Sequence, residues 1–384
     1  MPQEYYILII GYIFGFYMAW NIGANDVANS MASSVGAGSH VTNTIRKGIV
    51  STDIMADPHV ALIGALSALL AAAIWVSFAT WKSLPVSTTH SIVGAMLGFG
   101  IMAGGFAAIN WGKLFAVVLS WIISPLFSIV ISYLIFKTIV RSILSKKDTF
   151  ARALKLSPIF IGITFFVVVL SFLFKTPLGK KMDLGLTASL TVAIVLSVLL
   201  GFAGMAALKR FVKDRESGAE GIFRRIQVGT ACYVALAQGA NDVANAIGPL
   251  AVIYFLVKTG SVGAKVPVPV FLLLFGGVGI ACGIGMAGHR VMDTMGRKIT
   301  TLSNTRGFAI EFSTATTVLV ASKMGLPVST THSAVGGVLG VGLARGIEAV
   351  NFGIVFKIML YWLLTVPVAA LTSMAIFKLL QIIL

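Results

Sequence analysis

The sequence predicts an all-α polytopic membrane protein with two inverted-topology repeats and broken or re-entrant helices at the midplane. Hydrophobic residues make up 57% of the 384 positions and charged residues only 11%, far less charge than a soluble chain exposes. Two polar motifs each occur twice, in the same order. Apolar runs able to cross about 30 Å of hydrocarbon as helices cover 5–20, 60–81, 111–136, 157–174, 184–208, 268–286 and 352–384.

The net charge of +16 does not indicate nucleic-acid binding, because the basic residues gather in short loops between the apolar runs. Such an excess marks the cytoplasmic side of a membrane protein, so we expect the loops 141–155 and 209–225 to be cytoplasmic. The N-terminus carries Glu4 and no nearby Lys or Arg, which favours an outside location. The basic residues of the two loops are Arg141, Lys146, Lys147, Arg152, Lys155, Lys209, Arg210, Lys213, Arg215, Arg224 and Arg225.

The repeated motifs show an internal duplication. GANDVANS at 23–30 returns as GANDVANA at 239–246, and PVSTTHS at 85–91 returns at 327–333. Each PVSTTHS is followed by a glycine-rich apolar stretch. Two matching pairs in one order indicate duplication, so we expect a first repeat at 1–140, linking spans at 141–225 and a second repeat at 226–384. Since the loop charges start the first repeat outside and the second inside, the repeats should be inverted, as in secondary transporters with a midplane site.

The GAND segments are predicted to hold a hard cation. Asp26, Asp242 and Glu311 are the acidic residues at membrane depth, where a charge is costly unless it meets a cation or a hydrated cavity. A buried basic partner is the alternative, and Glu311 has Arg306 and Lys323 on its own segment. Glycine and Asn-Asp favour a helix break, and carboxylate and amide oxygens suit sodium. The candidate ligands are Asn25, Asp26, Asn29, Asn241, Asp242, Asn245 and Glu311.

The PVSTTHS segments are predicted to bind an anion. Proline suits a first helical turn, and the Ser-Thr-Thr that follows adds hydroxyl donors to the free N–H groups of a helix N-terminus. Hydroxyls that only cap or join helices are the alternative. Gln238, opposite Ile22 in the first repeat, could add an amide donor, and His90 and His332 are expected to be neutral caps. The candidate anion ligands are Ser87, Thr88, Thr89, Ser329, Thr330, Thr331 and Gln238.

Electrostatics then ties the two sites together. A phosphate-like anion carries about −1.5 to −2 charges near neutral pH. A carboxylate about 6 Å away would repel each charge by about 3 kcal/mol at an effective dielectric near 20. The anion can therefore bind only if cations lie between, which is the behaviour of a symporter.

These motifs resemble the inorganic phosphate transporter (PiT) family of sodium- or proton-coupled phosphate carriers. The resemblance rests on GANDVAN at 23–29 and 239–245 and on Pro-Val-Ser-Thr-Thr-His at 85–90 and 327–332, and it covers nearly the whole chain. It implies inverted repeats, about twelve spans, no prosthetic group and often a homodimer, and that Asn25, Asp26, Asn241, Asp242 and the Ser-Thr-Thr hydroxyls line the site. We expect import of inorganic phosphate with sodium across the plasma membrane. The family commonly has histidine where this chain has Gln238.

Other functions remain open at this stage. They are a proton-coupled phosphate or metal-phosphate carrier, a sulfate carrier, a channel and, from another class, an intramembrane hydrolase, although no GxSxG elbow is present. Cys232 and Cys282 lie in apolar runs and are expected to be buried. Between GANDVANS and the segment 39–49, the first repeat has no room for the span at 268–286. We therefore expect a segment of about twenty residues or more to be absent between Gly38 and Ser39.

Overall fold

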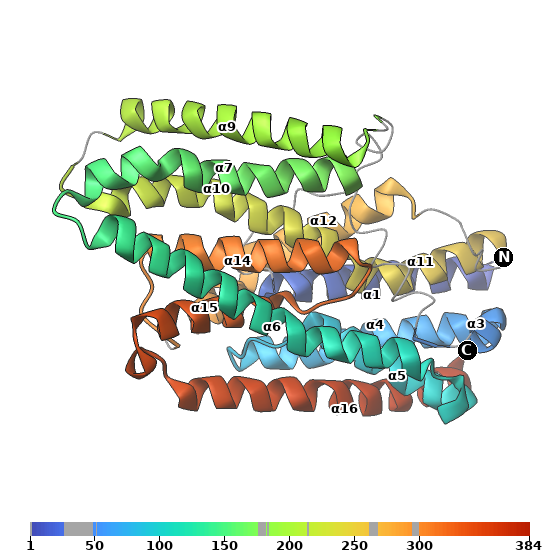
Figure 1. Cartoon of the computed structure of the whole chain (residues 1–384). Helices are drawn as coiled ribbons and strands as arrows, with labels where there is room; N and C mark the ends of the chain where they lie inside the picture. Colours follow the sequence, from blue (N-terminus) through green and yellow to red (C-terminus); the bar gives the residue numbers. More distant parts are fainter. Residues whose placement is uncertain are drawn as a thin grey trace.

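A computed structural model describes residues 2–26, 49–50, 52–175, 182, 184–212, 215–260, 268–293 and 299–384 (Figure 1). Asn29 and the Gly38–Ser39 junction lie outside these residues. Within them, regular structure is helical apart from one isolated bridge between Val50 and Ile109. The predicted all-α class is confirmed. The candidate membrane spans in this part of the chain number eight by length and composition, and together they cover all seven apolar runs of the sequence.

The long helices that build these spans are α1 (Pro2–Asn21), α4 (Pro58–Trp81), α6 (Trp111–Ile139), α7 (Thr149–Lys175), α9 (Leu186–Phe211), α10 (Gly218–Asn241), α11 (Val243–Thr259), α12 (Val270–Ala287) and α16 (Phe352–Ile383). Three further helices, which are not among the candidate spans, are α5 (Thr88–Gly104), α14 (Asn304–Lys323) and α15 (Thr330–Arg345). Short turns are η1 (Ile22–Asp26), α3 (Thr52–Ala56), η2 (Phe106–Ala108), η3 (Val140–Leu144), α13 (His289–Asp293) and η5 (Ile347–Ala349).

Helices of each half of the chain pack against helices of the other half. α6 of the first half lies against α15 of the second, and α16 of the second half lies against α5 of the first. Glycines allow both close approaches: a Cβ on Gly98 would be 2.2 Å from the Ala370 carbonyl oxygen, and one on Gly340 would be 2.3 Å from that of Ile129. Small residues of this kind let membrane helices approach backbone to backbone. The glycine-rich stretches after each PVSTTHS are therefore interhelical contact surfaces.

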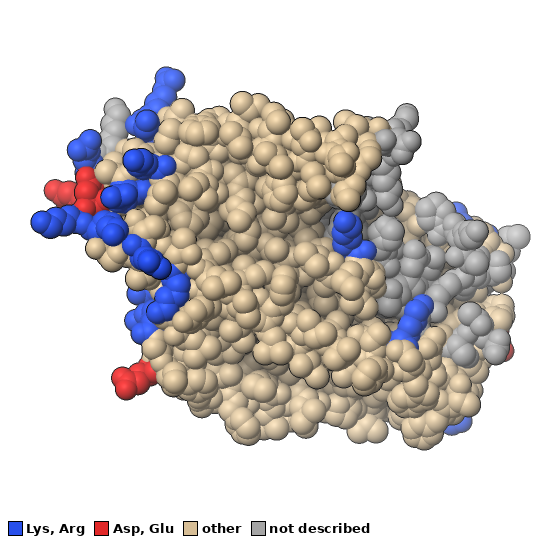
Figure 2. Space-filling model, in the orientation of Figure 1, with Lys and Arg blue, Asp and Glu red and all other residues tan. Residues whose placement is uncertain are grey.

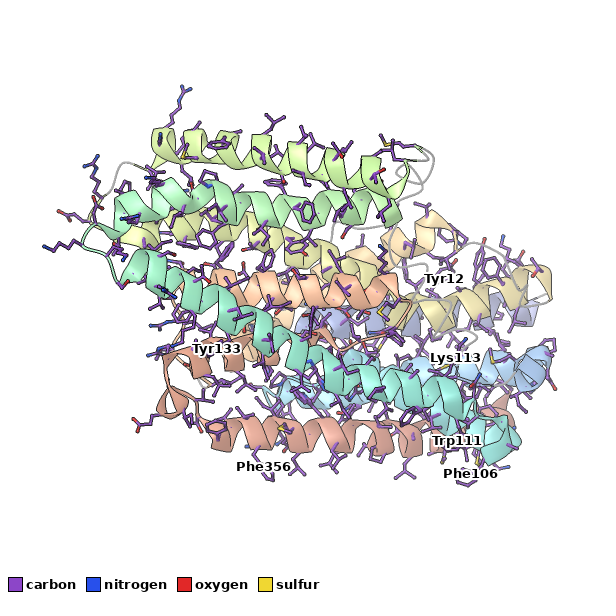
Figure 3. The ribbon with its side chains drawn as sticks, in the orientation of Figure 1. Tyr12, Phe106, Trp111, Lys113, Tyr133 and Phe356 are labelled. Atoms are coloured by element: carbon purple, nitrogen blue, oxygen red, sulfur yellow. The ribbon has the colours of Figure 1, made fainter. Side chains whose placement is uncertain are left out.

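α6 and α16 run in opposite directions. Figure 3 places Trp111 and Lys113, at the start of α6, near the end of the molecule where the chain terminates, and Tyr133 of α6 towards the opposite end. Phe356, near the start of α16, lies towards that opposite end, and Figure 1 shows the C-terminus back beside the start of α6. Asn110 and Asn351 cap the two helices in the same way, each accepting from the backbone N–H three residues on.

The two basic loops meet at one end of the molecule. The backbone N–H of Ala219 donates to Thr149 Oγ1 at 3.3 Å, and the Arg215 guanidinium lies 5.9 Å from the Phe150 ring centre. Figure 2 shows most of the visible Lys and Arg side chains gathered at this end, which we call the basic end. Both loops therefore face the same side, as the charge pattern requires.

One local prediction is confirmed in part and another was wrong. The second GAND segment interrupts the helix, since α10 ends at Asn241 and α11 begins at Val243, whereas the first continues α1 as the π-helical turn η1 up to Asp26, where the described residues end. Gly23 serves close approach instead, since a Cβ there would be 2.0 Å from the Ile280 carbonyl oxygen of α12. Cys232 and Cys282 are exposed, because the outer faces of membrane helices are apolar too.

Candidate anion and cation site

The two PVSTTHS segments form matching helix N-termini. Ser87 and Ser329 are the N-caps of α5 and α15, and each hydroxyl oxygen accepts from the histidine N–H three residues on, at 3.1 Å. The threonines begin the helices, so their hydroxyls lie beside the free N–H groups of the first turn. The prolines precede the caps by two residues rather than sitting in the first turn, because the serines have extended backbone. All six Ser and Thr side chains are buried.

Asp26 joins the two N-termini. Its carboxylate accepts from Thr88 at 2.5 Å and from Thr330 at 2.6 Å, and it also accepts from Thr331. A carboxylate of the first repeat is thus held mainly by hydroxyls of the second. Charge-assisted hydrogen bonds of this kind are stronger than neutral ones, so Asp26 is a structural junction as well as a charged group.

Asn25 anchors the loop that leads into α5. Its amide donates to Thr80 Oγ1 at 2.9 Å and to the Leu84 carbonyl at 3.0 Å, while its oxygen accepts from the Val86 N–H at 3.0 Å. Every polar atom of this side chain therefore has a protein partner. The geometry explains why an amide stands here, since it must both donate and accept.

The second GAND segment leaves oxygens free. Asn241 donates to Asp242 Oδ1 and to the Val328 carbonyl, both at 2.7 Å, and Asn245 donates to the Thr88 and Thr89 hydroxyls at 3.2 and 3.1 Å. Among the described residues, no hydrogen-bond partner is present for Asn241 Oδ1, Asp242 Oδ2 or Asn245 Oδ1, all of which are buried. Buried polar atoms are normally satisfied, so these three oxygens are the acceptors that the second GAND segment offers to a ligand.

A stack of four rings, which sequence analysis did not single out, crosses between the repeats. Trp121 stacks on His90 and Trp362 on His332, each with ring centres 3.6 Å apart, and the two histidines meet edge to face at 4.3 Å. The Trp121 indole donates to the Pro327 carbonyl at 3.1 Å, and that of Trp362 to the Pro85 carbonyl at 3.2 Å. Each tryptophan therefore holds the PVSTTHS loop of the other repeat. The sequence does carry a signal for these tryptophans. Trp121 follows Asn110 by 11 residues, and Trp362 follows Asn351 by the same 11 residues.

Glu311 lies outside the central polar cluster, whereas Gln238 contacts it. Glu311 accepts from Gln227 at 2.9 Å and from Thr230 at 2.5 Å, both on α10, rather than pairing with Arg306 or Lys323. Gln238 donates to the backbone carbonyl of Asp26 at 3.2 Å, so it touches the central cluster. The described residues that sequence analysis proposed thus meet in one buried cluster, except for Glu311, which lies on the neighbouring α10–α14 contact.

Membrane-length apolar helices and a buried polar cluster shared by the two halves of the chain are typical of a polytopic membrane transport protein. We call this cluster, formed by the GAND and PVSTTHS residues, the cage. Comparison with known proteins specifies which kind. The model of the phosphate transporter family matches residues 34–373, and this chain belongs to that family. It is therefore a transport protein rather than an enzyme, which removes the hydrolase alternative.

Relatives and a solved structure agree with this assignment. The chain is 48% identical, over 98% of both chains, to a Pyrococcus abyssi protein named "Putative phosphate permease". It is 39% identical to the chloroplastic inorganic phosphate transporter 2-1 of Arabidopsis thaliana, over 93% of this chain and 69% of that protein. A solved structure described as the sodium-dependent phosphate transporter is 44% identical, covers 98% of this chain and 100% of its own, and superposes with a TM-score of 0.88.

The alignments also bear on the length of the first repeat. The alignment with the Pyrococcus abyssi protein runs over 405 positions, more than the 384 residues of this chain, so that relative has residues without a counterpart here. Ile49 and Ile299 are structural counterparts, since their carbonyls accept from the N–H groups of Asn110 and Asn351 at 2.9 and 3.0 Å. Gly23 and Ile49 are 26 residues apart, whereas their counterparts Gly239 and Ile299 are 60 residues apart. This part of the first repeat is therefore much shorter than that of the second. The position of the absent segment stays a prediction.

Proposed function

We propose that this chain imports inorganic phosphate together with sodium ions, by alternating access around the cage formed by the GAND and PVSTTHS motifs. Membership of the phosphate transporter family and the sodium-dependent phosphate transporter of similar fold support this proposal. The observation that carries it is the pair of buried carboxylates beside two helix N-termini, with no Lys or Arg donating to either carboxylate among the described residues. An anion at these N-termini needs a cation to offset that negative charge.

Different residues of the cage would bind phosphate and sodium. The N–H groups of the first helical turns would bind phosphate oxygens. The hydroxyls of Thr88, Thr89, Thr330 and Thr331 would join them on releasing the Asp26 carboxylate and the Val328 carbonyl, to which they donate in this structure. Ser87 and Ser329 cap their helices and would direct those N–H groups. The free oxygens of Asn241, Asp242 and Asn245, with Asp26, would bind sodium. Glu311 would bind a cation on the path between the basic end and the cage.

The architecture suits alternating access. We infer inverted repeats at 1–140 and 226–384, supported by the opposite directions of α6 and α16 and by the matched caps of α5 and α15. With the basic loops in the cytoplasm of a plasma membrane, the N-terminus would be outside. Because each tryptophan holds the PVSTTHS loop of the other repeat, movement of one repeat would carry the opposite binding loop with it.

Uptake of radiolabelled phosphate into proteoliposomes tests the function. The protein is reconstituted and uptake is compared under an inward sodium gradient, under a matched potassium gradient, and under an inward proton gradient without sodium. We expect saturable uptake that requires sodium. Uptake that follows external pH without sodium would establish proton coupling instead, and uptake of labelled sulfate in preference to phosphate would overturn the assigned anion.

A further inference from the structure

A cavity lies apart from the cage, between α7, α9 and α10. Its volume is about 650 Å³, and of its fourteen lining residues only Arg225 is charged. That volume lies in the range of roughly 300–1,000 Å³ typical of small-molecule sites. The remaining lining is mostly aliphatic and aromatic, with Ile161 and Phe165 from α7, Ala207 and Phe211 from α9, and Tyr233 from α10. The cavity therefore suits a ligand that is largely hydrocarbon.

Arg225 gives the cavity a positive end. It belongs to the first turns of α10, next to Arg224 and close to the basic loops. Figure 2 shows basic side chains concentrated at this end of the molecule. Arg225 is exposed, and it makes no hydrogen bond or ion pair within the described part of the chain. A guanidinium with no partner among the described residues, at the edge of an apolar cavity, favours an anion joined to a hydrocarbon chain.

The cavity opens towards the lipid-facing side of the molecule. Phe165 and Phe211 both line it and are exposed, the latter by 72%. α9 is the outermost of the three helices in Figure 1, and only 17% of its apolar window is buried. We propose that this cavity binds one acyl chain of an anionic glycerophospholipid, with the lipid phosphate group on Arg225. A free phosphate ion would use the arginine but would leave the apolar lining without a partner.

The same turns of α10 hold Glu311 on their other side. Thr230 lines the cavity and donates to Glu311, and Gln227, three residues earlier, donates to its second oxygen. A lipid chain in the cavity would pack directly against the turns that carry these two donors. Bound lipid should therefore stabilise the Glu311 contact.

Native mass spectrometry with purified protein measures this binding without transport. Phosphatidylglycerol and phosphatidylcholine with identical acyl chains are titrated onto wild type, Arg225→Gln and the matched control Arg224→Gln, whose side chain is exposed but does not line the cavity. We expect one phosphatidylglycerol to bind more tightly than phosphatidylcholine. Arg225→Gln should weaken that binding by about tenfold or more, as expected for one charge-assisted hydrogen bond. Equal losses in Arg225→Gln and Arg224→Gln would overturn the proposal.

A second variant tests the apolar part. Gly229 lines the cavity, and a Cβ on it would meet no atom within 4 Å. The larger side chain of Gly229→Leu should therefore fill the cavity and abolish the binding of phosphatidylglycerol there. Gly277→Leu on α12 is the control, because a Cβ there also meets nothing within 4 Å. Unchanged lipid binding in Gly229→Leu would place the lipid elsewhere and contradict the proposal. A dimer that closes the cavity and holds no lipid would also contradict the proposal. So would stabilisation of the protein by inorganic phosphate alone, if that stabilisation disappears in Arg225→Gln.

Discussion

Asp26 and Asp242 stand at the same place in the two repeats, yet their oxygens have different surroundings. Asp26 accepts hydrogen bonds from three threonine hydroxyls, two of them from the other repeat. Asp242 accepts from the neighbouring Asn241, and its Oδ2 has no partner among the described residues. The same contrast holds for the amides, since the Asn25 oxygen accepts from the Val86 N–H whereas the Asn241 oxygen has no partner in the described part of the chain.

This difference teaches that duplication supplied two equivalent polar segments, and that packing then gave them separate tasks. The side chains of the first segment hold the two PVSTTHS loops together, and Asp26 also supplies negative charge beside the proposed cation. The second segment has oxygens without a partner among the described residues, which are costly in a buried place unless a cation binds them. This contrast leads to predictions that test whether the two GAND segments have different roles.

The largest effect is expected at the two aspartates. Asp26→Asn and Asp242→Asn should each abolish sodium-driven phosphate uptake, to below about one hundredth of wild type, because each removes a negative charge that attracts sodium. Uptake into proteoliposomes is the measurement. Coupled transport retained in both variants would contradict the role of the GAND segments.

Stability should separate the same two variants. Asp26→Asn weakens three hydrogen bonds to a charged group, so it should lower the free energy of unfolding by about 2–4 kcal/mol. Asp242→Asn removes a buried carboxylate oxygen that lacks a partner, and the sodium-free protein should keep or gain stability. Thermal unfolding in sodium-free detergent solution compares them, and an equal loss in both would show that the two sites are alike.

Glu311 extends the comparison, because the sequence shows no acid in the corresponding part of the first repeat. Glu311→Gln should raise the sodium concentration for half-maximal uptake by about tenfold, since an amide attracts a cation far less than a carboxylate. Thr230→Val is the matched variant, as it removes one donor to Glu311 and leaves the charge. Unchanged sodium dependence in Glu311→Gln would make this residue a purely structural acid.

The tryptophans test the part of the cage where the repeats are alike. Trp121→Phe and Trp362→Phe keep a ring for stacking but remove the N–H that holds the opposite proline carbonyl. Each should slow uptake by about fivefold, corresponding to about 1 kcal/mol for one hydrogen bond, and the two effects should be similar. Initial uptake rates at saturating sodium provide the test. A large effect in one variant only would show that the stack is functionally asymmetric.

The smallest effect concerns Gln238, which is isoleucine at the corresponding position of the first repeat. Gln238→Ile makes the two positions the same and removes the hydrogen bond to the Asp26 carbonyl. We expect the phosphate concentration for half-maximal uptake to rise by about threefold, with sodium dependence unchanged. A change in sodium dependence instead would assign Gln238 to the cation site.

Much of the site could be predicted because its residues repeat. The duplicated GAND and PVSTTHS motifs identified Asp26, Asp242 and the threonines, and the helix starts at Thr88 and Thr330 follow from local capping rules. Their partners could not be predicted, because Thr330 is 304 residues from Asp26 and only the packing of α6 on α15 and α16 on α5 brings them together. The role of Gly23 could not be predicted for a related reason. It is required by the close approach of α12, which no local pattern reveals.

Phosphate binding with and without sodium tests the central claim most directly. Equilibrium binding of labelled phosphate to the purified protein is measured in sodium chloride and in choline chloride at the same ionic strength, for wild type and Asp242→Asn. A repulsion of about 3 kcal/mol per charge pair predicts that phosphate binds wild type about a hundredfold more tightly with sodium. Asp242→Asn should lose most of this difference. Equal phosphate affinity of the wild type in the two salts would contradict the account.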